Sequence, residues 1–157
     1  MATTPTLVHN IRTILAGHTD GESSLLAVLE EIQTHHRYLP RDALILVSER
    51  LDAPLSQVYS VATFYNAFSL VPQGRHKFQV CTGTACHVRG AMHVLDRLEA
   101  QLGIQAGQTS IDLEYTLETV NCMGACALGP IVVADGKYAG QMTASQVDRL
   151  LKKLKAV

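Results

Sequence analysis

Two stretches of the sequence, KFQVCTGTAC (residues 77–86) and YTLETVNCMGAC (residues 115–126), share one pattern: polar and apolar residues alternate, and a pair of cysteines follows. Alternation of this kind predicts a half-buried β-strand. All four cysteines of the chain lie in these two pairs. Each pair is therefore expected just beyond the end of a strand, and both pairs meet at one edge of the sheet if the two strands are parallel.

The segment between the pairs predicts how the strands are joined. Apolar residues recur at helical spacing over residues 87–102, and Gly103 can end that helix. Strands joined through such a helix are expected to be parallel, with a right-handed crossover. Further on, Asp135-Gly136 predicts a hairpin between two short strands. Thr143 and Gln146 stand at capping-box spacing and predict the start of a last helix.

The first part of the chain has a different pattern. Over residues 1–70, apolar residues recur at helical spacing in four segments separated by Gly17, Pro40 and Pro54. Pro72 and Gly74 then mark a boundary. We expect an N-terminal helical domain over residues 1–72 and an α/β domain over residues 76–157. The element order of the second domain is that of a small thioredoxin-like fold.

Composition excludes several classes of function. The chain has 157 residues and a formal net charge of −1, which gives no general attraction to nucleic acid or to an anionic membrane. Its apolar stretches are too short to span a bilayer, so no direct membrane insertion is expected. No secretory signal is visible at the N-terminus, and a cytoplasmic location is therefore expected.

The cysteine spacing indicates a metal centre. Cys81 and Cys86 are separated by four residues, and Cys122 and Cys126 by three. A 2Fe–2S cluster needs four thiolates, two for each iron, and two pairs on separate loops can supply them. A tetrahedral zinc site can use two cysteine pairs as well. Two disulfides or four buried thiols are further alternatives, so the spacing alone leaves the nature of the centre open.

The loop residues favour the cluster. Gly83 allows the chain to bend tightly, and the small residues of both loops allow backbone N–H groups to approach the sulfur atoms, which would stabilise their charge. Longer motifs around these loops resemble the thioredoxin-like 2Fe–2S subunit of NADH dehydrogenases, which is the 24-kilodalton type of complex I, and of related NAD(P)-linked hydrogenases and formate dehydrogenases. The motifs are VYSVATFY (58–65), PQG (72–74), CTGTACHVRG (81–90) and VNCMGACALGP (120–130).

The resemblance implies one 2Fe–2S cluster held by Cys81, Cys86, Cys122 and Cys126. It also implies an iron–sulfur electron-transfer subunit of a larger NAD(P)-linked oxidoreductase. The complex I form often has proline before the second cysteine, whereas this chain has Ala85. The loop is therefore more similar to the hydrogenase and formate dehydrogenase branch than to the respiratory branch.

The same resemblance implies partner subunits. In the family, this subunit docks on a flavoprotein that binds FMN and NAD(P)H, alongside further iron–sulfur subunits. The chain itself has no G-x-G-x-x-G motif after a strand and no G-x-x-x-x-G-K-[ST] motif. We therefore expect FMN and NAD(P) only on the partner, and no catalysis by this chain alone.

Other interpretations remain open at this point. One is a zinc-stabilised interaction domain. Another is a thiol–disulfide oxidoreductase, although neither cysteine pair has the C-x-x-C spacing. His87 follows Cys86, but a Rieske-type site needs two histidines, and a surface role is expected for it. Arg89 could steady an anionic cluster, bind a partner carboxylate or be a plain surface residue.

Overall fold

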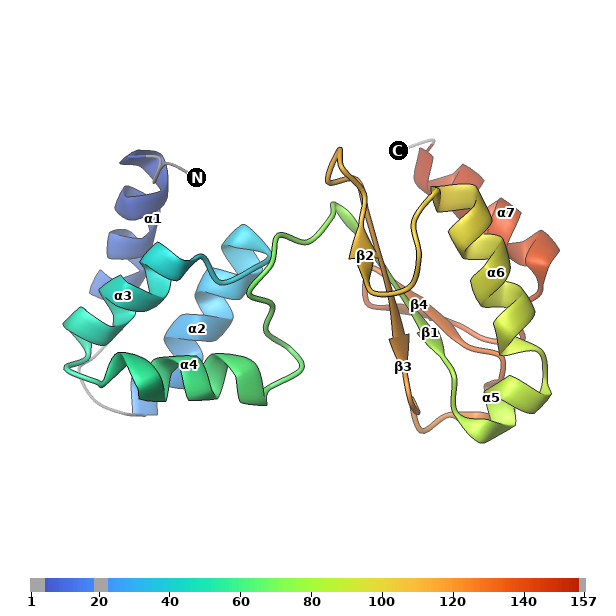
Figure 1. Cartoon of the computed structure of the whole chain (residues 1–157), viewed down its shortest axis with the longest axis horizontal. Coiled ribbons are helices and arrows are strands. Elements are labelled where there is room, and N and C mark those ends of the chain that lie inside the picture. Colours follow the sequence, from blue (N-terminus) through green and yellow to red (C-terminus); the bar gives the residue numbers. More distant parts are fainter. Residues whose placement is uncertain (1–4, 19–22, 156–157) are drawn as a thin grey trace. The chain divides into compact units, whose positions relative to one another are not determined.

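A computed structural model of the chain describes residues 5–18 and 23–155. The chain forms two compact units, Met1–Pro72 and Gln73–Val157 (Figure 1). Among the described residues, no helix is both long and apolar enough to cross a membrane.

The first unit is helical, and the expected segments are confirmed. Pro40 and Pro54 are the residues directly before the third and fourth helices. A proline is tolerated there because the first N–H groups of a helix have no partner within it. The helices are α1 (Pro5–Ala16), α2 (Ser23–His36), α3 (Arg41–Arg50) and α4 (Leu55–Phe64).

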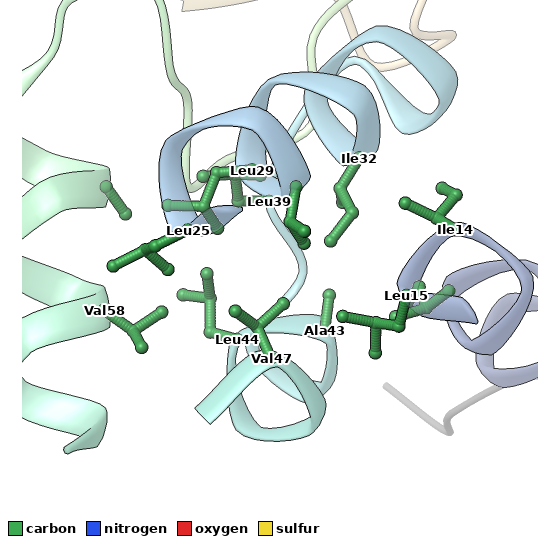
Figure 2. Close-up of a cluster of buried hydrophobic side chains, with 13 residues drawn as sticks. Ile14, Leu15, Leu25, Leu29, Ile32, Leu39, Ala43, Leu44, Val47 and Val58 are labelled. Carbon is green, nitrogen blue, oxygen red and sulfur yellow. The ribbon is translucent and has the colours of Figure 1, made fainter. Parts of the chain in front are cut away.

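Apolar side chains from all four helices share one core. Figure 2 shows them converging between the helices, with Leu15 from α1, Leu29 from α2, Val47 from α3 and Val58 from α4. Leu39, in the connection between α2 and α3, is also buried there. Helices of this length are marginal in isolation, so this shared burial is what stabilises the unit.

The second unit is a mixed sheet with helices. Its sheet has the strand order β2-β3-β1-β4-β5. β1 and β3 are parallel, as expected, and the other neighbours are antiparallel. The elements are β1 (His76–Cys81), α5 (Thr84–Val88), α6 (Ala91–Leu102), β2 (Gln108–Thr109), β3 (Tyr115–Val120), the 3-10 turn η1 (Cys126–Leu128), β4 (Val132–Ala134), β5 (Lys137–Ala139) and α7 (Ala144–Lys155).

The two faces of the central strands differ. On one face, Phe78 and Leu117 are buried in a core to which α6 and α7 contribute. Figure 1 shows both helices on one side of the sheet. On the other face, Glu118 accepts a hydrogen bond from Gln79 at 3.2 Å and forms an ion pair with Lys77 at 2.9 Å. This alternation is the period-two pattern that the sequence displays.

One expected helix is divided in two. Residues 87–102 are not continuous, because Gly90 has a φ of 93° and separates α5 from α6. A left-handed residue cannot continue a right-handed helix, and glycine adopts that conformation without penalty. The short helix α5 therefore carries Cys86 independently of the long helix α6. The two-residue strand β2 was also not expected from the sequence.

The C-terminal elements follow the expected turn chemistry. Asp135 and Gly136 have φ values of 49° and 77°, which suits a two-residue hairpin turn. The side chain of Gln146 accepts the N–H of Thr143 at 2.8 Å, and the Thr143 hydroxyl accepts the N–H of Gln146 at 3.4 Å. These two bonds form the expected capping box of α7.

The second compact unit includes residues 73–75, which lie between the two expected domains. The Gly74 N–H donates to the Thr116 hydroxyl at 2.7 Å, and the Arg75 N–H donates to the Leu113 carbonyl at 2.7 Å. A side chain at position 74 would place its Cβ 2.5 Å from the Tyr115 carbonyl carbon. We therefore propose two separate domains, residues 1–72 and residues 73–157.

We predict that a fragment of residues 73–157 folds alone and is more stable than a fragment of residues 76–157. The shorter fragment lacks two N–H donors to β3 and its preceding loop, and each such bond contributes about 1 kcal/mol. Its free energy of unfolding should be lower by about 1–3 kcal/mol, as measured by urea denaturation of both fragments without cluster. Equal stabilities, or a longer fragment that does not unfold cooperatively, would contradict this boundary.

Candidate metal centre

The parallel strands bring both cysteine loops to the same end of the sheet. Cys81 is the last residue of β1 and lies opposite Val120, the last residue of β3. The next N–H, that of Thr82, donates to the Val120 carbonyl at 2.9 Å. Cys122 follows two residues after Val120. The expectation that both pairs emerge at one edge is thereby confirmed.

The four cysteines differ in exposure. Cys81 and Cys86 are buried, with 2% and 1% of their surface exposed, and they share a small apolar cluster with Ala91. Cys122 and Cys126 are exposed, and all four thiols are free of disulfide bonds. The site thus has a buried half on the first loop and an exposed half on the second.

Backbone N–H groups from both loops are directed at the buried sulfur of Cys81. Burial raises the pKa of this thiol, but hydrogen bonds from the N–H of Gly83, the Cys86 thiol and the N–H of Met123 outweigh it, so the pKa lies below its ordinary value. Burial and the hydrogen bond with Cys81 raise the pKa of Cys86. Negative charge is therefore accepted first on Cys81, where the expected N–H groups are in place.

Glycine allows close contacts at two points of the site. A Cβ at Gly83 would lie 2.6 Å from the Asn121 carbonyl oxygen and 3.6 Å from the Cβ of Cys122. A Cβ at Gly129 would lie 3.0 Å from the Cys86 sulfur. The 2.6 Å contact with backbone is too short for a larger residue without movement of the loops, whereas the 3.0 Å contact is tight and would require the Cys86 sulfur to shift slightly. Gly83 is thus needed for contact between the loops, in addition to the tight bend that the sequence suggested.

The second loop has hydrogen bonds of its own. Gly124, with a φ of 79°, donates its N–H to the Cys122 sulfur at 3.4 Å. Cys126 begins the turn η1. The Arg89 Nη1 donates to the carbonyl oxygens of Cys126 at 2.8 Å and of Ala127 at 3.1 Å. The Arg89 side chain therefore holds the second loop close to the buried half of the site, in addition to the backbone contacts between the loops.

The predicted ligands are brought together only in part. Cys81 and Cys86 are hydrogen-bonded, and Cys126 is close enough to raise the pKa of Cys86 further. Cys122 lies beside the first loop, where it packs next to Gly83. Among residues 5–18 and 23–155, no group of three or more His, Cys, Asp or Glu side chains is gathered as a metal site. The donor set nevertheless fits an iron–sulfur cluster, since four free thiols lie on two adjoining loops with N–H groups directed at sulfur.

Sequence reasoning overlooked two features of the site. The close approach of Gly129 to the Cys86 sulfur depends on the fold, because Cys86 is distant from it in the sequence. The carbonyl partners of Arg89 were also not foreseen, although Arg89 itself was noted. His87 is exposed on α5, and its backbone N–H donates to the Gly83 carbonyl at 2.8 Å. Its exposure agrees with the surface role expected from the sequence.

Comparison with curated proteins places these features among known relatives. The chain is 39% identical over 130 residues to the HndA subunit of an NADP-reducing hydrogenase from Solidesulfovibrio fructosivorans, covering 83% of this chain and 76% of that one. It is 34% identical over 151 residues to an NADH-quinone oxidoreductase subunit from Rhizobium meliloti, covering 96% of this chain and 90% of that one.

A solved structure and a family model agree with these relatives. The chain is similar to an NAD+-reducing [NiFe]-hydrogenase, with a TM-score of 0.73 and 25% identity over 85% of this chain, but it spans only 23% of the hydrogenase chain. The family model of the thioredoxin-like [2Fe-2S] ferredoxins matches residues 11–155. As the cysteine motifs indicated, the chain belongs to the thioredoxin-like [2Fe–2S] ferredoxin family, and this membership implies one 2Fe–2S cluster.

Proposed function

We propose that this chain is an iron–sulfur electron-transfer subunit, with Cys81, Cys86, Cys122 and Cys126 as the ligands of its 2Fe–2S cluster. The observation that carries the proposal is the parallel pairing of β1 with β3, which places both cysteine loops at one end of the sheet. Two loops, each with two thiols, match the requirement of two thiolates for each iron.

The residues around the cysteines suit a one-electron carrier. When bound, an all-cysteine 2Fe–2S cluster supplies a centre that takes up a single electron at a low potential, on the order of −400 mV in plant-type ferredoxins. The N–H groups of Gly83 and Met123 at Cys81 and that of Gly124 at Cys122 stabilise negative charge on sulfur. Such hydrogen bonds favour the reduced, more negative state and raise the potential.

We also propose that the chain works inside a multi-subunit NAD(P)-linked oxidoreductase. Its relatives are named as subunits of an NADP-reducing hydrogenase and of NADH-quinone oxidoreductase. The partner we propose is a flavoprotein that binds FMN and NAD(P)H, together with further iron–sulfur subunits. Ala85 before Cys86 favours the hydrogenase or formate dehydrogenase type over respiratory complex I. The setting we propose is cytoplasmic.

The cofactor is tested by analysis of the purified protein. Protein purified without oxygen should be brown and contain about two iron atoms and two acid-labile sulfides for each chain, as determined by colorimetric assay. One zinc ion without sulfide would contradict the proposal and favour a zinc-stabilised interaction domain.

The ligand set is tested at two exposed residues, Cys122 of the second loop and His87 on α5. Cys122→Ser should lose most of its bound iron, because a hydroxyl is a poorer iron ligand than a thiolate. The replacement is nearly isosteric and exposed, so it should leave the helical content unchanged. The matched control His87→Ala should keep its iron. Iron and visible absorbance measure both outcomes, and loss of iron in the histidine variant alone would reverse the assignment.

Catalysis is tested with the isolated subunit. It should accept electrons from dithionite but fail to oxidise NADH or NADPH with an artificial acceptor, because no nucleotide-binding motif is present in its sequence. Addition of the flavin-bearing partner should allow the nicotinamide to reduce the cluster. Rapid NADH oxidation by the single chain, shown to be free of flavin, would overturn the carrier assignment.

A further inference from the structure

Arg89 connects two parts of the metal centre that are distant in the sequence. It follows directly after α5, the short helix that carries Cys86. Its Nη1 donates to the carbonyl oxygens of Cys126 and Ala127, 37 and 38 residues away, at 2.8 and 3.1 Å. One arginine therefore links the helix of one proposed ligand to the turn of another.

The contact matters because the Cys126 turn is short and lies at the surface. The turn η1 contains only three residues, and Cys126 is exposed at its start. Within the turn, the Gly129 N–H donates to the Cys126 carbonyl at 3.2 Å. A guanidinium is planar and offers two N–H groups on one terminal nitrogen, so it can hold two adjacent carbonyls in a fixed geometry. Arg89 thus adds a rigid external support to a small turn.

We propose that Arg89 is a positioning residue for the cluster, holding the Cys126 turn against the Cys86 helix and placing a positive charge beside a ligand. This inference rests on the proposed ligand set. The two hydrogen bonds from Arg89 should slow loss of the cluster, because residues that orient metal ligands contribute to the affinity for the metal. The charge should favour the reduced cluster, which carries one more negative charge than the oxidised form.

The two effects can be separated by substitution in the full chain. Arg89→Ala removes both the hydrogen bonds to the Cys126 turn and the positive charge. Arg89→Lys keeps the charge but loses the planar pair of donors. The matched control is Arg97→Ala on α6, since Arg97 also makes a two-bond contact, to Asp148 on α7 at 2.8 and 3.0 Å. That variant removes an arginine of the same domain without touching either cysteine loop.

Two measurements are made on each variant. The first is the rate at which visible absorbance is lost in a chelator without oxygen. The second is the midpoint potential, from a redox titration followed by electron paramagnetic resonance. Arg89→Ala should lose its cluster about tenfold faster than the parent protein and have a lower potential. Arg89→Lys should also lose the cluster faster but keep the parent potential, and Arg97→Ala should match the parent in both.

The outcomes distinguish this inference from the proposed function. If the parent protein and Arg97→Ala hold a 2Fe–2S cluster and Arg89→Ala is equal to them in loss rate and potential, the positioning role is wrong and the ligand set stands. If Arg97→Ala loses its cluster as fast as Arg89→Ala, and the potentials are equal, the effect is one of general stability and the inference is also wrong. If the parent protein holds no 2Fe–2S cluster, the proposed function itself fails.

Discussion

The parallel pairing of β1 with β3 is the constraint on which the rest of the metal centre depends. Parallel strands end at the same side of a sheet, and here both are followed at once by a cysteine loop. Had the two strands been antiparallel, the loops would lie at opposite ends of the sheet. The crossover through α5 and α6 enforces the parallel direction, so the connecting helices are as important to the site as the strands.

The buried half and the exposed half of the site suit two different requirements of an electron carrier. Cys81 and Cys86 are enclosed, and the N–H groups of Gly83 and Met123 compensate part of the cost of charge on Cys81. Cys122 and Cys126 lie on the second loop and are exposed. The electron carrier that we propose would need to keep its centre away from bulk water and still bring it near a partner. An enclosed pair backed by the sheet and an outer pair near the surface meet both needs.

Local patterns made much of this structure predictable. Alternation indicated β1 and β3, and turn chemistry indicated the hairpin at Asp135-Gly136 and the capping box of α7. Features that depend on distant contacts were not predictable. Gly90 is a residue type that can end a helix, but its position inside a continuous helical pattern hid the break that its left-handed conformation makes. Two-residue β2 is too short to show a period. The carbonyl partners of Arg89 exist only because the fold brings η1 to the end of α5.

The outer strands of the sheet have a consequence for how the protein behaves among its own copies. β2 has two residues and β5 has three, and β5 begins with a lysine. A sheet margin this short presents few free N–H and C=O groups to a neighbouring chain, and a charge further opposes strand addition. We therefore expect little tendency of this sheet to add strands from a second copy of the chain.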